Sequence, residues 1–181
     1  VYTSGSTGNP KGVCITQANL AAAAANFGEI GFRSDDEYCC FASLMFIASV
    51  YDIAVSLSLG MTLHLIPKEI RRDIHAIAAY YRERGITVTF LPPHMACKYI
   101  ACDEGSPLRI LLVGSEPVHN LRKRPYRIVD VYASSEGCGI ISHCDVEDER
   151  TAYPIGRTVK GMKYYVVDEN GSRVERGTRG E

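Results

Sequence analysis

A short segment near the start of the chain is rich in groups that bind phosphate. Residues 2–12 carry four serine or threonine hydroxyls, three glycines and one lysine. Glycines allow backbone N–H groups to converge on an oxyanion, hydroxyls add hydrogen-bond donors, and the lysine adds a mobile positive charge. The residues expected to form this site are Thr3, Ser4, Gly5, Ser6, Thr7, Gly8 and Lys11. The segment therefore predicts a phosphate-binding loop.

Two common kinds of glycine-rich segment differ from this loop. In the P-loop of nucleoside triphosphatases, glycine precedes the lysine and serine or threonine follows it. Here Pro10 precedes Lys11 and Gly12 follows it. A flexible linker would have no need of proline and lysine at fixed places directly before an apolar strand. The loop therefore indicates a nucleotide-binding site of another class.

Helices and strands alternate after the loop. The alanine-rich residues 17–27 predict a helix directly behind it, an arrangement that suits an anion. Further helices are predicted over residues 51–59 and 70–84, and strands over residues 62–66, 87–91, 109–113, 128–132 and 164–167. The Asp-Glu-Asn-Gly sequence at 168–171 predicts the turn of an antiparallel hairpin near the C-terminus. The pattern predicts an α/β fold, a layered sheet flanked by helices, with ligands at the carboxyl ends of the strands.

The composition argues against some classes of partner. With 181 residues, of which 46% are hydrophobic, the chain has the size and core of about one ordinary domain. Twenty basic residues balance 21 acidic ones, so no overall field attracts nucleic acid or an anionic membrane. Seven cysteines without a Cys-x-x-Cys pair are typical of reduced thiols, and we expect a cytoplasmic protein. The start at Val1, without a leader segment, indicates a piece of a longer protein.

The loop also resembles the phosphate-binding signature of one enzyme group. Its sequence Tyr-Thr-Ser-Gly-Ser-Thr-Gly-x-Pro-Lys-Gly-Val is similar to that of the adenylate-forming (ANL) superfamily, especially the amino-acid adenylation domains of nonribosomal peptide synthetases. Residues 46–52, 111–116, 131–136 and 154–157 match later motifs of these domains in order. The resemblance implies the central part of the large N-terminal domain of such an enzyme. Residues 1–150 would form an ATP- and acyl-binding α/β subdomain, and residues 151–181 the truncated start of a β-rich subregion.

The resemblance implies ATP and Mg²⁺ as cofactors. Lys11, Ser135 and Glu136 would be the catalytic residues, and Glu136 would also hold the metal. Tyr132 would stack on the adenine, and Asp130 would lie near its amino group. The other implied nucleotide contacts, apart from the phosphate loop, are Gly114, Ser115, Glu116 and Val131. The activity that the resemblance implies is the ATP-dependent activation of a carboxylic acid as its acyl-adenylate. The carboxylate attacks the α-phosphorus of ATP, and this step needs charge neutralisation and alignment more than a protein nucleophile.

The acid substrate would be a small carboxylic acid held in a pocket between the same motifs. The residues implied to line this pocket are Ile47, Ala48, Tyr51, Phe90, Leu111, Val113, Val131, Gly139 and Ile140, none of which is charged. In domains that activate α-amino acids, the place of Ile47 usually carries an aspartate that pairs with the substrate ammonium. Because a buried ammonium beside isoleucine would be costly, we expect an uncharged α-keto, α-hydroxy, aryl or short aliphatic acid. The alternatives are that Ile47 is misaligned or that the protein has degenerated.

The expected acyl acceptor is the phosphopantetheine thiol of a carrier protein. An acyl-CoA ligase of the same superfamily is one alternative, and a noncatalytic nucleotide-binding module is another. Only fifteen residues lie between Glu116 and Tyr132, so a helix expected there must be short or missing. The chain also ends before the place where these enzymes have a ribose-binding aspartate, a hinge and a mobile C-terminal domain. We therefore expect this piece alone to be inactive.

Overall fold

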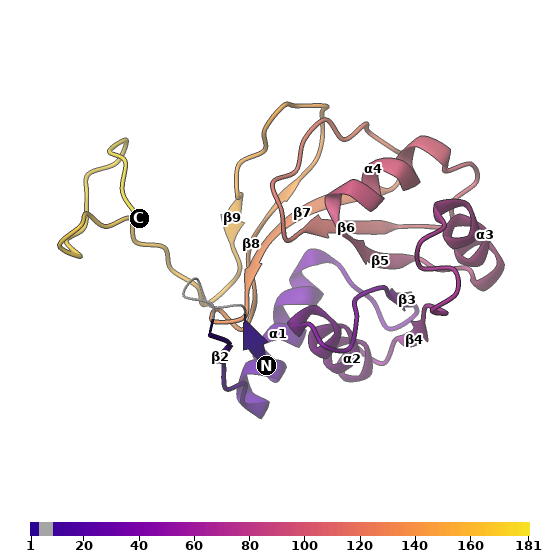
Figure 1. The fold of residues 1–181 in the computed structure, drawn as a ribbon, viewed down its shortest axis with the longest axis horizontal. Coiled ribbons are helices and arrows are strands. Elements are labelled where there is room, and N and C mark those ends of the chain that lie inside the picture. The colour runs from indigo at the N-terminus through magenta and orange to yellow at the C-terminus, as the bar shows by residue number, and fades with distance from the viewer. Residues whose placement is uncertain (4–8) are drawn as a thin grey trace.

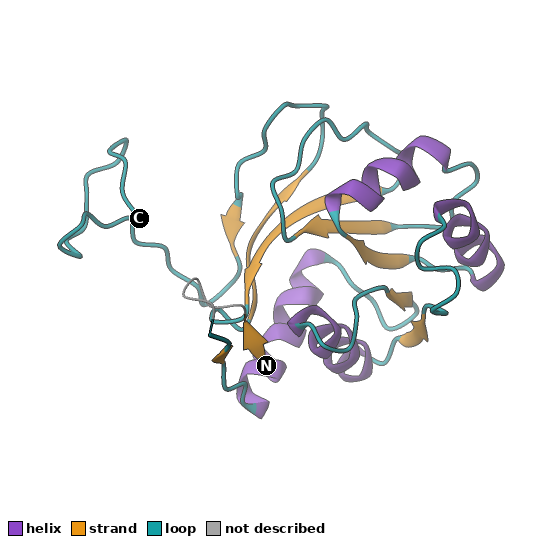
Figure 2. Ribbon diagram, in the orientation of Figure 1, coloured by secondary structure: helices purple, strands orange, loops and turns teal. Residues whose placement is uncertain are grey.

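The computed structural model describes residues 1–3 and 9–181. In this part of the chain the strands are β1 (Tyr2–Thr3), β2 (Lys11–Gly12), β3 (Glu37–Cys40), β4 (Thr62–Leu65), β5 (Val88–Leu91), β6 (Ile110–Gly114), β7 (Arg127–Ser134), β8 (Gly139–Asp145) and β9 (Arg157–Thr158). The helices there are α1 (Gln17–Ile30), α2 (Ile47–Leu59), α3 (Ile74–Arg84) and α4 (Pro93–Cys102). Figure 2 shows a twisted sheet between helices, with the C-terminal segment extending away from it.

A mixed sheet forms the centre of the described residues. Its seven strands follow the order β4-β3-β5-β6-β7-β8-β9, visible in Figure 1. Neighbouring strands from β4 to β7 are parallel, whereas β8 and β9 join antiparallel. All five residues of β6 are buried, as expected of a parallel strand covered on both faces. The predicted α/β fold is confirmed.

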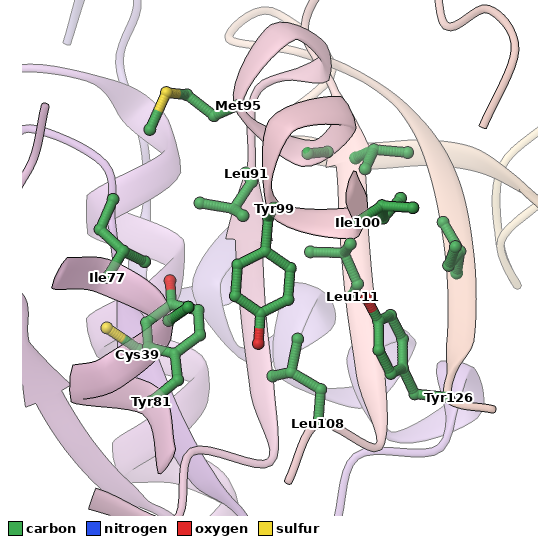
Figure 3. Close-up of a cluster of buried hydrophobic side chains, with 14 of the residues drawn as sticks. Cys39, Ile77, Tyr81, Leu91, Met95, Tyr99, Ile100, Leu108, Leu111 and Tyr126 are labelled. Atoms are coloured by element: carbon green, nitrogen blue, oxygen red, sulfur yellow. The ribbon is translucent and has the colours of Figure 1, made fainter. Parts of the chain in front are cut away.

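Each face of the sheet has its own hydrophobic core. On β6, Leu111 and Val113 pack in the core that includes residues of α3 and α4, whereas Ile110 and Leu112 pack in the core that includes α1 and α2. Figure 3 shows the first core, where the rings of Tyr81 and Tyr99 have centroids 5.5 Å apart. Because successive side chains of a strand point to opposite faces, neighbouring residues of β6 pack in different cores.

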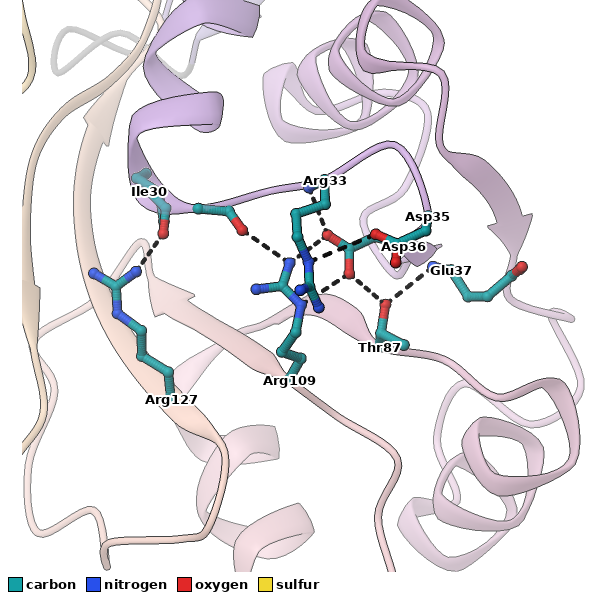
Figure 4. Close-up of polar contacts among 9 residues, drawn as sticks. Ile30, Arg33, Asp35, Asp36, Glu37, Thr87, Arg109 and Arg127 are labelled. Carbon is teal, nitrogen blue, oxygen red and sulfur yellow. Dashed lines mark hydrogen bonds and ion pairs between the residues drawn. The ribbon is translucent and has the colours of Figure 1, made fainter.

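Two arginines fix the end of α1 to the amino-terminal edge of the sheet (Figure 4). Arg109 donates to the carbonyl oxygen of Gly31 at 2.8 Å and forms an ion pair with Asp36. Arg127 donates to the carbonyl oxygen of Ile30 and pairs with Asp145 at 2.7 Å. Against the effect of burial, the hydrogen bond from Arg109 holds the pKa of Asp36 below its ordinary value. These positive charges bind carbonyl groups at the negative end of the helix.

Several predicted boundaries differ from the structure. Helix α3 begins at Ile74 rather than at residue 70, because the Asp73 side chain accepts hydrogen bonds from the backbone N–H groups of His75 and Ala76 and caps the helix there. Strand β3, helix α4 and strand β8 were not predicted. Pro92 is the N-cap residue of α4, and Pro93 is its first residue, where a missing backbone N–H group costs no hydrogen bond of the helix.

The C-terminal segment confirms the hairpin only in a short form. The strand predicted over residues 164–167 is wrong, because a single antiparallel bridge joins Val167 to Arg173 among the described residues. The N–H group of Asp168 donates to the carbonyl oxygen of Ser172 at 2.8 Å and closes the predicted turn. The described connection at residues 115–126 contains no helix, as expected from its length. The division at residue 150 stays a prediction, although β9 extends the sheet beyond it.

Candidate functional site

Two neighbouring cavities lie around the carboxyl ends of β6 and β7 in the described part of the chain. The first, which we call the β6–β7 cavity, has a volume of about 330 Å³ and is lined by Ser115, Glu116, Pro117, Val118, His119, Asp130, Val131, Tyr132, Ala133, Ala152, Tyr153 and Ile155. The second, the α2 cavity, has a volume of about 580 Å³ and is lined by Thr3, Phe27, Ile47, Ala48, Tyr51, Asp52, Phe90, Leu112, Ser115, Val131, Ala133, Ser134, Ser135, Glu136, Gly139 and Ile140. The two cavities share Ser115, Val131 and Ala133.

The β6–β7 cavity offers an aromatic ring and a carboxyl group to a ligand. Tyr132 is 47% exposed, so part of its side chain is free for contact. Burial raises the pKa of Asp130 to about 6, although a hydrogen bond from the backbone of Val131 lowers it. A flat heterocycle with an amino group would suit this pair, because the ring stacks and the carboxylate accepts. Five residues predicted to contact a nucleotide therefore lie at one cavity: Ser115, Glu116, Asp130, Val131 and Tyr132.

The backbone between the two cavities is tightly constrained. A Cβ atom at Gly114 would lie 2.3 Å from the carbonyl oxygen of Val131, so only glycine allows β6 and β7 to approach this closely. Ser115 then takes a positive φ of 74°, which is uncommon for a residue with a side chain. On β7 the register with β8 shifts between Tyr132 and Ala133. Such bulges and unusual backbone angles often orient functional groups at binding sites.

The α2 cavity contains most of the residues predicted to surround an acid. Ile47, Ala48, Tyr51, Phe90, Val131, Gly139 and Ile140 all line it. The helix predicted from residue 51 begins at Ile47 in the structure, which places Ile47 and Ala48 in its first turn. The placement of Leu111 and Val113 in the pocket is wrong, because both face the opposite core. Leu112 lines the cavity instead, since it points to the other side of β6.

One charged residue of this cavity was missed by the sequence prediction. Asp52 is 4% exposed and receives a hydrogen bond from the Tyr38 hydroxyl at 2.6 Å. Burial raises the pKa of Asp52 to about 6, and the hydrogen bond from Tyr38 opposes this rise. Asp52 lies four residues after Ala48 on α2, so both side chains share one helix face. Extending the predicted helix back to residue 47 would have revealed this charge.

The predicted phosphate loop is described only at its ends. Thr3 on β1 pairs with Lys11 on β2, and Thr3 also lines the α2 cavity. Ser4, Gly5, Ser6, Thr7 and Gly8 lie outside the described residues. Lys11 is exposed, and helix α1 begins soon after it, capped by the side chain of Thr16. The ends of the loop therefore bring one lysine and one hydroxyl to the region of the α2 cavity.

The turn between β7 and β8 carries the remaining predicted catalytic residues. Ser135 and Glu136 line the α2 cavity. The backbone N–H of Gly137 donates to the Ser134 hydroxyl at 2.8 Å, and a Cβ atom at Gly137 would lie 2.5 Å from the Ile141 side chain. The turn is thus closely packed behind Glu136, whose exposed side chain is available to a ligand.

The carboxylate of Glu136 fits a magnesium ion whose other ligands are phosphate oxygens and water. Within residues 1–3 and 9–181, no group of three or more His, Cys, Asp or Glu side chains could hold a metal. Mg²⁺ typically binds one or two carboxylates and takes its other ligands from substrate phosphates and water. Glu136 and Thr3 line the same cavity, so a single carboxylate beside the predicted phosphate loop would suit this ion. None of the helices in the described part of the chain is long and apolar enough to cross a membrane.

The whole chain matches a known enzyme family. A family profile described as AMP-binding enzyme matches residues 1–181. The chain is 29% identical over 182 residues to surfactin synthase subunit 2 of Bacillus subtilis (strain 168) and 28% identical over 189 residues to tyrocidine synthase 1 of Brevibacillus parabrevis. Both alignments cover 100% of this chain, but only 5% and 17% of the relatives. The chain therefore spans a small part of the curated relatives that it matches.

Two solved structures share the fold. The Klebsiella oxytoca NpsA N-terminal subdomain, in complex with 3-hydroxybenzoyl-AMSN, has a TM-score of 0.82 at 22% identity and covers 100% of this chain and 49% of its own. The Vibrio cholerae adenylation domain AlmE, in complex with glycyl-adenosine-5'-phosphate, has a TM-score of 0.83 at 22% identity and covers 99% of this chain and 37% of its own. At this identity the likeness concerns the fold.

Proposed function

We propose that the intact protein activates a carboxylic acid with ATP, because this chain belongs to the AMP-binding enzyme family. The chain also resembles the adenylation domains of nonribosomal peptide synthetases. The product would be an acyl-adenylate, and pyrophosphate would be released. The observation that carries the proposal is the junction of the two cavities at Ser115, Val131 and Ala133. A nucleotide in one cavity and an acid in the other would meet there, which lowers the entropic cost of their reaction.

The nucleotide would occupy the β6–β7 cavity and extend toward the phosphate loop. Tyr132 would stack on the adenine, and the Asp130 carboxylate would accept a hydrogen bond from its amino group. Ser115 and Glu116 border the same cavity, and Gly114 allows the close strand approach beneath it. The phosphates would be held by Thr3, Ser4, Gly5, Ser6, Thr7, Gly8 and Lys11.

The catalytic groups would act mainly by neutralising charge. The carboxylate oxygen attacks the α-phosphorus of ATP, the bond to pyrophosphate breaks, and Lys11 stabilises the negative charge of the phosphates. Ser135 would donate a hydrogen bond to the α-phosphate or the substrate carboxylate. Glu136 would hold Mg²⁺, which when bound neutralises further phosphate charge. No proton has to leave the acid, because it reacts as a carboxylate.

The acid would be an α-keto, α-hydroxy, aryl or short aliphatic acid rather than an ordinary α-amino acid. Ile47 lines the α2 cavity in the first turn of α2. This isoleucine provides no countercharge for an α-ammonium group, which would be costly to bury there. One solved neighbour is a complex with 3-hydroxybenzoyl-AMSN and the other a complex with glycyl-adenosine-5'-phosphate, so their shared fold is compatible with more than one class of acid.

The acyl group would pass to the phosphopantetheine thiol of a carrier protein. The curated relatives are peptide synthetases, which favours this acceptor over CoA. All seven cysteines of the chain are free thiols, which supports a cytoplasmic location, where ATP is also supplied. Nucleic acid and membrane are not expected partners.

ATP–pyrophosphate exchange by the full-length protein tests this proposal. We expect exchange with one or more keto, hydroxy, aryl or aliphatic acids and a fall of about 100-fold or more in Lys11→Ala. Lys98→Ala, which alters an exposed lysine on α4, serves as the matched control and should retain full exchange. Exchange with α-amino acids alone would contradict the assignment of the acid. The absence of exchange with every acid of the panel would contradict the proposed enzymatic activity and favour a noncatalytic nucleotide-binding module.

A further inference from the structure

We propose that the α2 cavity recognises a hydrogen-bond donor on the tail of the acid, and that Asp52 accepts this hydrogen bond. The proposal rests on the acid-activating function above and narrows its substrates to acids with a hydroxyl or amino group remote from the carboxylate. Asp52 would act as a specificity-determining residue.

The first argument is an unused acceptor. Oδ1 of Asp52 receives the Tyr38 hydroxyl at 2.6 Å, whereas Oδ2 is buried and has no hydrogen-bond partner among the described residues. The Cys40 thiol lies near this carboxyl group, but it donates to the carbonyl oxygen of Ala42 at 3.7 Å. A carboxylate has about four lone-pair positions. A buried acceptor left unpaired is costly, so a ligand that supplies a donor is favoured.

The second argument is the depth of Asp52 in the cavity. Helix α2 connects the parallel strands β3 and β4, so its first turn lies at the carboxyl edge of the sheet, near the proposed chemistry. Asp52 follows Ala48 by four residues on α2, or about 6 Å along the helix axis. A group that reaches Asp52 therefore belongs to the end of the acid that points away from the reacting carboxylate.

The third argument is the contrast between the carboxylate and the walls around it. Phe27, Phe90, Leu112 and Ile140 line the same cavity with hydrocarbon side chains, beside Tyr51, whose buried hydroxyl also has no hydrogen-bond partner among the described residues. The hydrocarbon side chains remove water from the acyl tail without offering an acceptor, which strengthens a hydrogen bond to Asp52. Ile47 leaves an α-ammonium without a countercharge, whereas a donor one turn deeper along α2 would meet a carboxylate.

Matched pairs of acids in ATP–pyrophosphate exchange test the proposal in the full-length protein. Each pair consists of an acid with a terminal hydroxyl or amino group and the same acid without it, on an aryl ring in one series and on an aliphatic chain in another. The wild type should prefer the donor-bearing member by about 10- to 100-fold in kcat/KM. The hydroxyl and amino series decide which donor is the natural one.

Asp52→Asn is the decisive variant. Because the Tyr38 hydroxyl would keep the amide oxygen, the NH₂ group would face the position of Oδ2, and the preference for a donor should vanish. Ser56→Ala is the matched control, since Ser56 is also buried on α2 without a hydrogen-bond partner in the described structure. Ser56 does not line the cavity, so its variant should keep the wild-type preference.

Two results would overturn the role of Asp52: equal kcat/KM for both members of every pair in the wild type, or an unchanged preference in Asp52→Asn. Equal kcat/KM values in the wild type would overturn the role of Asp52 even if the variant fails to fold. Binding of the same pairs without ATP, measured by calorimetry, separates this proposal from the enzymatic one. A donor preference in binding without any exchange would support the role of Asp52 and contradict the proposed acid-activating function. Exchange without a donor preference would support the acid-activating function and contradict the role of Asp52.

Discussion

Asp52→Asn should also make the protein more stable, by an amount that depends on pH. The ordinary carboxyl pKa of 3.8 rises to about 6 in the folded protein, mainly because of burial. The folded state therefore holds its proton more tightly than the unfolded state. Stability is lost as pH rises from about 4 to about 6, as the buried carboxyl group ionises. The rise in pKa corresponds to a penalty of about 3 kcal/mol above pH 6. Asparagine avoids this penalty and keeps an acceptor for the Tyr38 hydroxyl.

Urea unfolding of the full-length protein at pH 4 and pH 7.5 measures this effect. We expect Asp52→Asn and the wild type to differ little in free energy of unfolding at pH 4, and the variant to be more stable by up to about 3 kcal/mol at pH 7.5. Asp35→Asn is the control, because the Asp35 side chain is 78% exposed. A difference between Asp52→Asn and wild type that stays constant between the two pH values would refute the reasoning.

Two further substitutions test the constraints that hold the site in place. Gly114→Ala should cost about 1–3 kcal/mol and weaken exchange, because the new Cβ meets the backbone of β7, whereas Gly28→Ala meets open space and should not destabilise α1. Thermal unfolding of both variants checks this, and equal midpoints would contradict it. Arg109→Met should cost about 3–5 kcal/mol in urea unfolding, because Asp36 is only 2% exposed and would lose the positive charge paired with it. The exposed Arg33→Met should cost less than about 1 kcal/mol, and similar losses for the two arginine variants would count against a structural role for Arg109.

The sequence predicted the main elements because long apolar or alanine-rich runs have few structural alternatives. The buried strand β6 and helix α1 are such runs. Strand β3 has only four residues, Glu-Tyr-Cys-Cys, without alternation of polar and apolar side chains. Its place in the sheet comes from pairing with β4 and β5, which local sequence does not encode. Helix α4 was hidden by prolines that usually indicate a turn.

The candidate site was predictable where a motif spans consecutive residues, and less so where side-chain direction matters. Residues near the ends of β6 and β7 do gather around two cavities. Leu111, Leu112 and Val113 are all apolar and all buried, so the sequence does not reveal which of them faces the acid. Asp52 escaped notice because its direction depends on where α2 begins. The predicted and observed pocket residues therefore differ for two reasons: alternate residues of β6 face opposite sides of the sheet, and the face of α2 that carries Asp52 was not known.

Transfer of an oxygen atom from the acid to AMP tests the central claim most directly. The full-length protein would receive ATP, hydroxylamine as an acyl acceptor and an accepted acid labelled with oxygen-18 in its carboxyl group. Attack on the α-phosphorus leaves a carboxyl oxygen on that phosphorus, so AMP isolated from the reaction should carry one labelled oxygen by mass spectrometry. Formation of ADP with labelled phosphate, or of unlabelled AMP, would contradict activation of the acid as an acyl-adenylate.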